Sequence, residues 1–126
     1  MFMKKFFIFL LFPSAVFCYG QPPRIEKASA SSALSDSQGW YPASNLIDHT
    51  WQSWAEASKG NGVGEYFTLT MYHSETITGI AIKNGYGNIY HFAKNNRVKA
   101  LKVYVDGTLI DTVAIKDSIS FEQYYF

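Results

Sequence analysis

The sequence predicts an all-β protein, built as an antiparallel β-sandwich. From Tyr66 onward, apolar residues recur at every second position, which is the period of a strand with one buried face. Nowhere do apolar residues recur at helical spacing over ten or more residues. Clusters of Gly, Asn, Asp and Pro break the apolar stretches at intervals typical of sandwiches, so we expect short strands joined by turns and structured loops.

The first twenty residues are predicted to be a signal peptide rather than part of the fold. Lys4 and Lys5 form a basic start, the run from Phe6 to Phe12 is apolar, and Cys18-Tyr19-Gly20 offers small residues at a cleavage site. Cleavage is expected after Gly20. This predicts a secreted or periplasmic protein.

An uncleaved membrane anchor and a lipid anchor are the two alternatives to a cleaved leader. Pro13 interrupts the apolar run, which is shorter than the ~20 residues of a membrane span, so no span is expected. Cys18 is a candidate for lipidation, but Phe17 stands before it where a small residue is expected. Cleavage without lipidation is therefore favoured.

Removal of residues 1–20 would leave 106 residues with nine basic and ten acidic side chains and no cysteine. Because acidic and basic residues nearly balance, the sequence predicts no basic surface for nucleic acid and no polybasic patch for anionic lipid. A domain of this size without disulfides depends on its apolar core, and 17% of the whole chain is aromatic.

Before the regular strands, the sequence predicts one weak strand and a long structured loop. The weak strand covers Ile25 to Ala30, and a Ser/Ala-rich loop follows it. The stretch from Gly39 to Tyr66 holds Trp40, Trp51 and Trp54 among many turn-forming residues, with one helical turn expected over 42–48. Trp54 is expected to pack in the core.

After Tyr66, the alternation predicts strands separated by turns and by one long loop over 84–96. Asp106-Gly107 is the signal of a two-residue type I′ hairpin turn. The strands are expected at 66–71, 76–83, 97–105, 109–115 and 120–126.

Five separate blocks of the sequence carry a family resemblance: Asn45-Leu46-Ile47-Asp48, Ser53-Trp54-Ala55-Glu56, residues 60–66, residues 79–86 and residues 95–99. In this order, they resemble the discoidin-like (coagulation factor type C) translocation domain of NAD glycohydrolases. The resemblance covers about residues 28–126 and implies a galactose-binding-like jelly roll. It also implies a non-catalytic module that binds carbohydrate or a cell-surface ligand through loops at one end. Glycohydrolase activity is not implied, because it belongs to a separate domain.

The same resemblance predicts a domain over residues 21–126 that is incomplete at its C-terminus. We expect about six strands, whereas jelly rolls close with about eight. The family continues with further strands, whereas this sequence stops at Tyr124-Tyr125-Phe126. We interpret the chain as a truncated copy or a fragment of a longer protein.

Aromatic residues on the loops are the first candidates for ligand binding. Tyr86 and Tyr90 lie on the Gly-rich loop after the Ile80 strand, and Trp40 with Tyr41 lies on the early loop. An exposed aromatic ring suits the C–H face of a sugar. The alternative is that these rings pack in the interior.

Arg97 with Asn95 is the polar part of the predicted ligand site. A planar fork of donors beside an amide suits sugar hydroxyls or a carboxylated sugar. The alternative is a buried Arg97 paired with Glu56 or Glu65, holding the long loops together.

A structural calcium ion is the one cofactor considered, through Asp48 and Glu56. Galactose-binding-like domains often carry such an ion near this loop, and calcium prefers clustered oxygens. However, His49 stands where the resemblance leads us to expect glycine. Otherwise no cofactor is expected.

Catalysis has little support in the sequence. His49, His73 and His91 are isolated, and no G-x-S-x-G or phosphate-cradling motif occurs. Two function classes remain. The first is a secreted binding module for a glycan or cell-surface ligand. The second is a structural, translocation or targeting domain of a longer protein, or a remnant without autonomous binding.

Overall fold

The computed structural model describes residues 7–11, 24–50, 52–74 and 76–126. The rest of the predicted leader, with Cys18, and also Trp51 lie outside the described residues. The described residues form ten strands, one 3-10 turn and one four-residue helix. The predicted all-β class is therefore confirmed.

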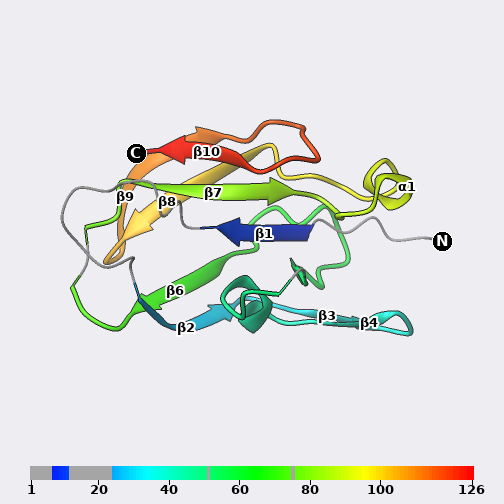
Figure 1. Cartoon of the computed structure of the whole chain (residues 1–126), viewed down its shortest axis with the longest axis horizontal. Helices are drawn as coiled ribbons and strands as arrows, with labels where there is room; N and C mark the ends of the chain where they lie inside the picture. Colours follow the sequence, from blue (N-terminus) through cyan, green and yellow to red (C-terminus); the bar gives the residue numbers. More distant parts are fainter. Residues whose placement is uncertain (1–6, 12–23, 51, 75) are drawn as a thin grey trace.

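The largest sheet has four antiparallel strands, in the order β10 (Glu122–Tyr125), β7 (Gly79–Asn84), β1 (Phe7–Leu11) and β5 (Trp54–Ala55). In Figure 1, β10, β7 and β1 run side by side. The other strands form three antiparallel pairs: β2 (Ile25–Ala30) with β6 (Phe67–Met71), β3 (Leu34–Asp36) with β4 (Gly39–Tyr41), and β8 (Ala100–Val105) with β9 (Thr108–Ala114).

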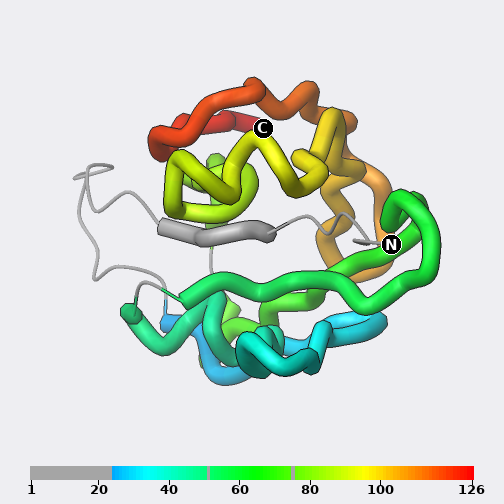
Figure 2. The backbone as a smooth tube through the Cα atoms, turned by 90° about the vertical axis from the view of Figure 1, so that its right-hand side faces the viewer, coloured from blue at the N-terminus to red at the C-terminus, as the bar shows by residue number. Residues whose placement is uncertain are grey.

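The strands are divided between two sides of the molecule. In Figures 1 and 2, β2, β3 and β4 lie on one side, while the C-terminal strand β10 lies on the other. Apolar side chains from both sides meet in the core, which is built on Leu46, Trp54 and Ile82. Phe67 of β6 packs edge-on against Trp54, with ring centroids 5.6 Å apart. The arrangement is the sandwich that the sequence predicts.

The period-two pattern holds where one face of a strand is covered. In β6 the apolar residues at 67, 69 and 71 are half-buried, and the threonines between them are exposed. In β7 both Ala81 and Ile82 are buried, although they point to opposite faces. This strand is therefore covered on both sides, as expected for the middle of a sheet.

The predicted type I′ turn at Asp106-Gly107 is confirmed. Both residues have positive φ, 48° and 80°, and Val105 pairs directly with Thr108 across the turn. Positive φ at both central positions gives the turn a twist that matches the flanking strands. Glycine meets this requirement without steric cost.

A short hairpin stands where the sequence predicts only loop. Leu34 pairs with Tyr41 and Asp36 with Gly39. Asp36 Oδ1 closes the turn by accepting from the backbone N–H groups of Gln38 and Gly39, at 2.8 and 3.1 Å. The expectation of loop was wrong here because side-chain capping stabilises strands that are too short to show a period.

Residues 7–11 were expected to stay outside the fold as part of a leader, but in this full chain they form β1. Ile8 to Leu11 pair with Asn84 to Ala81, and Phe7 and Ile8 pair with Ala55 and Trp54. A run of Phe, Ile and Leu has high strand propensity, so it can complete a sheet as readily as it can form the apolar part of a leader. Cleavage after Gly20 stays a prediction.

The 3-10 turn η1 (Ala43–Leu46) is the helical turn predicted over 42–48. It starts after Pro42 and buries Ala43 and Leu46. The buried Asn45 amide donates to the Ser53 carbonyl at 2.9 Å. These contacts hold the long loop against β5.

Candidate functional site

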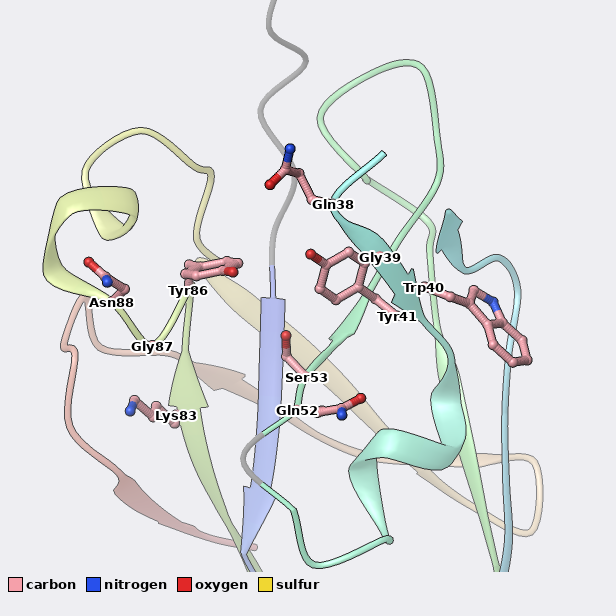
Figure 3. A pocket seen from close by; sticks show the side chains of 10 residues that line it. All are labelled: Gln38, Gly39, Trp40, Tyr41, Gln52, Ser53, Lys83, Tyr86, Gly87 and Asn88. Carbon is pink, nitrogen blue, oxygen red and sulfur yellow. The ribbon is translucent and has the colours of Figure 1, made fainter. Parts of the chain in front are cut away.

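A cleft of about 540 Å³ opens between the β3–β4 hairpin and the segment that follows β7 (Figure 3). Its described lining residues combine tyrosine rings, side-chain amides and one lysine, and none of them is a carboxylate. The lining residues are Gln38, Gly39, Trp40, Tyr41, Gln52, Ser53, Lys83, Tyr86, Gly87 and Asn88.

Tyr41 and Tyr86 face each other across this cleft (Figure 3). Burial raises the pKa of the Tyr41 hydroxyl above its ordinary value, and Tyr86 and Asp36 add to this shift. Tyr41 is therefore a neutral hydroxyl at physiological pH, able to donate and accept hydrogen bonds.

The backbone around Gly85 sets the position of Tyr86. Gly85 has φ of +97°, and a Cβ there would lie 3.0 Å from both Phe92 and Arg97. The chain can therefore turn sharply out of β7 only with glycine at this position. His91, in the helix α1 (Ile89–Phe92), packs edge-on against Tyr86 with centroids 5.1 Å apart.

The structure places only some of the predicted aromatic residues at the cleft. Trp40 borders the cleft and is 66% exposed, but its ring points away from the Tyr41–Tyr86 pair (Figure 3). This follows from strand alternation on β4. Tyr90 lies on α1, is 79% exposed and lies outside the lining. Tyr86 and Trp40 are thus brought to one cleft, and Tyr90 is not.

Arg97 and Asn95 are held in structural contacts. Arg97 bonds both oxygens of Asp117, at 2.7 and 3.2 Å, and also the carbonyls of Phe92 and Asn95. Asn95 donates from its side chain to the His91 carbonyl at 3.0 Å. The predicted pairing of Arg97 with Glu56 or Glu65 was wrong, because the fold brings Asp117 to its guanidinium instead.

The two calcium candidates lie in different surroundings. Asp48 is exposed and its Oδ1 accepts from the N–H and hydroxyl of Thr50. Glu56 is only 1% exposed, and its Oε2 accepts from the Ser58 N–H at 2.6 Å. In the part of the chain that the structure describes, no three His, Cys, Asp or Glu side chains gather as a metal site.

No local sequence pattern marks the polar residues of the cleft as a group. Gln38 follows the Asp36 turn, Gln52 precedes the buried Ser53, and Asn88 caps α1 by accepting from the Tyr90 N–H at 2.8 Å. Lys83 is the one exception, because its place after Ile82 in an alternating strand predicts that its side chain points away from the buried face. The amides come from three loops that only the fold brings together.

The fold and the cleft define a class: a discoidin-like β-sandwich with its candidate site among loops and strand ends. Residues 18–125 match the family model described as the NAD glycohydrolase translocation F5/8 type C domain. The match spans nearly the whole chain, so this protein belongs to that family. Comparison with curated proteins and with solved structures found no match.

The family match identifies the matched region as a translocation module rather than a catalytic one. The resemblance noted in the sequence is thereby confirmed. Among the described residues, no helix has the length and apolar character to cross a membrane.

Proposed function

We propose that this protein is a non-catalytic recognition module whose cleft holds one sugar unit of a glycan on a cell-surface ligand. The observation that carries the proposal is the Tyr41–Tyr86 pair within a cleft lined by side-chain amides. The predicted leader would deliver the domain to the secreted or periplasmic space.

The cleft offers two kinds of contact that suit a sugar. The rings of Tyr41 and Tyr86 provide flat apolar surface for a sugar C–H face, and their hydroxyls provide polar edges. Gln38, Gln52 and Asn88 provide both amide donors and carbonyl acceptors. A hydroxyl-rich neutral ligand can use both kinds of contact at once.

The charge of the lining narrows the ligand class. Among the lining residues that the structure describes, Lys83 is the only charged one, and its Nζ lies 6.0 Å from the centroid of the Phe121 ring. A lining whose described residues include one cation favours neutral or singly acidic sugars over basic ligands. Arg97 is not required, because Asp117 and two carbonyls engage its guanidinium.

A second candidate follows from the family: a translocation or targeting domain that contacts a protein partner within a longer polypeptide. The two candidates differ in what reaches the Tyr41–Tyr86 pair. In the first case, a free glycan would bind at the two rings without any partner protein. In the second case, a protein partner would bind, and added free sugar would not compete with it.

The test is saturation-transfer NMR of the full chain with a panel of neutral and acidic glycans. We expect transfer to one glycan class, its loss in Tyr86→Ala, and its retention in Tyr104→Ala, which removes an exposed tyrosine of β8 outside the cleft. Absence of transfer to every glycan in a chain that melts cooperatively would refute sugar recognition and leave the translocation role. Loss of transfer in both variants would equally contradict binding at the cleft.

A further inference from the structure

Strand β1 is an inner strand of the four-stranded sheet, with β7 on one side and β5 on the other. It pairs with β7 through four residues and with β5 through two. Ile8 takes part in both pairings, opposite Asn84 and opposite Trp54. Any segment in this position therefore joins β7 to β5 and closes a gap between them.

The walls of this position are buried. Ala81, Ile82 and Asn84 of β7 and Trp54 and Ala55 of β5 have almost no exposed surface. Trp54 and Ile82 also belong to the hydrophobic core. Withdrawing β1 would leave the backbone N–H and C=O groups that β7 and β5 turn toward it without a partner.

The five residues of β1, Phe7–Leu11, lie inside the predicted signal peptide. Cleavage after Gly20 would separate β1 from the rest of the sheet, leaving an apolar gap with two unpaired strand edges. Such a gap is the kind of surface that accepts an added strand, because main-chain hydrogen bonds give affinity whatever the sequence.

We propose that the space between β7 and β5 is a strand-acceptor site. Residues 7–11 fill it in the full chain, and after leader removal it takes an extended apolar segment of a partner polypeptide, antiparallel to β7. This inference does not depend on sugar binding in the cleft.

The surroundings define the chemistry of the occupant. Ala81 and Ile82 face opposite sides of the sheet and both are buried, so a strand beside them meets covered surface on both faces. Strands covered on both faces are continuous apolar runs rather than alternating ones. The segment Phe7-Ile8-Phe9-Leu10-Leu11 has this character, and a partner segment should share it.

The experiment starts from the full chain with a specific protease site inserted between Gly20 and Gln21. After cleavage, we expect residues 1–20 to stay bound through β1. A labelled peptide of residues 5–12, with added terminal lysines for solubility, should then replace them at one peptide per protein. The same peptide with proline in place of Phe9 should bind at least about tenfold more weakly, because proline removes a ladder donor and distorts the strand.

Amide hydrogen exchange provides the control for specific insertion. Bound peptide should slow exchange in β7 and β5 and leave the β8–β9 hairpin unchanged. The proposal is overturned if the cleaved chain releases residues 1–20, keeps its melting temperature and takes up no peptide. It is equally overturned if the cleaved chain unfolds and the peptide cannot restore it, or if the proline peptide binds as well as the original.

Discussion

The side-chain amide of Asn84 bonds both backbone polar groups of Val98. Its Nδ2 donates to the Val98 carbonyl at 2.8 Å, and its Oδ1 accepts from the Val98 N–H at 2.9 Å. The same Nδ2 lies 3.2 Å from the Lys116 carbonyl. Asn84 is only 2% exposed, so this one side chain at the end of β7 fixes the entry to β8 and the exit from β9.

Replacing Asn84 with alanine should lower the free energy of unfolding by about 3 kcal/mol, because the Val98 N–H and C=O would lose their partner in a buried site. Urea unfolding followed by tryptophan fluorescence measures the change. Asn61→Ala is the matched control. Asn61 is exposed and accepts one long bond of 3.4 Å, so its loss should cost less than about 0.5 kcal/mol. Equal stability of the two variants would contradict the role of Asn84.

Glycine is required at position 79 for the pairing of β7 with β10. A Cβ at Gly79 would lie 2.5 Å from the Tyr124 carbonyl oxygen. Gly79→Ala should therefore destabilise the protein by about 1–3 kcal/mol. Gly60→Ala is the control, because a Cβ at Gly60 meets nothing within 4 Å. Thermal melts compare the two variants. A similar melting temperature for both would show that β7 and β10 can move apart at this position without loss of stability, and would contradict the prediction.

The Arg97–Asp117 ion pair should make stability depend on acid pH. Hydrogen bonding to Arg97 lowers the pKa of Asp117 in the folded protein. The ionised carboxylate therefore adds stability above its unfolded pKa of about 3.9, and this contribution is lost as the pH falls through the lower folded pKa.

The variant Asp117→Asn should thus melt below the wild type at neutral pH, and the difference should shrink once the pH falls below about 4. Melting temperatures between neutral pH and pH 2 test this. Asp111→Asn, which changes an exposed residue of β9, should show no such convergence. A difference for Asp117→Asn that stays constant down to pH 2 would argue against the ion pair as its source.

The hydroxyl of Tyr86 should influence the titration of Tyr41. Burial is the first cause of the raised pKa of Tyr41, and the interaction with Tyr86 adds to it. In Tyr86→Phe, the pKa of Tyr41 should fall but stay above its ordinary value of 10.0, because burial remains. Carbon-13 NMR of labelled tyrosine Cζ atoms follows the titration. Tyr104→Phe should leave it unchanged, and an unchanged pKa in Tyr86→Phe would rule out contact between the two hydroxyls.

Much of the strand pattern could be predicted from the sequence. The alternation of Phe67, Leu69 and Met71 marks β6, and Asp106-Gly107 marks the β8–β9 turn with its positive φ values. Pro42 marks the start of η1. The β3–β4 hairpin was missed because three-residue strands carry no measurable period, although Asp36 and Gly39 form a recognisable turn signal.

The candidate site was predicted less completely than the fold. Of the predicted residues, Tyr86 and Trp40 border the cleft, whereas Arg97 and Asn95 are held in structural contacts. The partner of Arg97 could not be deduced, because several carboxylates lie within plausible reach along the sequence. Sequence spacing does not say which carboxylate the loops bring near.

The amino-acid sequence alone is enough to predict the all-β class, the placement of most strands and the type I′ turn, because side-chain alternation and backbone sterics act between near neighbours. It does not show that Tyr41 lies near Tyr86, that Asn84 bonds Val98 or that β1 lies between β7 and β5, which follow from the packing of the chain. These contacts join segments far apart in the sequence. They depend on how the sheets and loops pack, which no local pattern encodes.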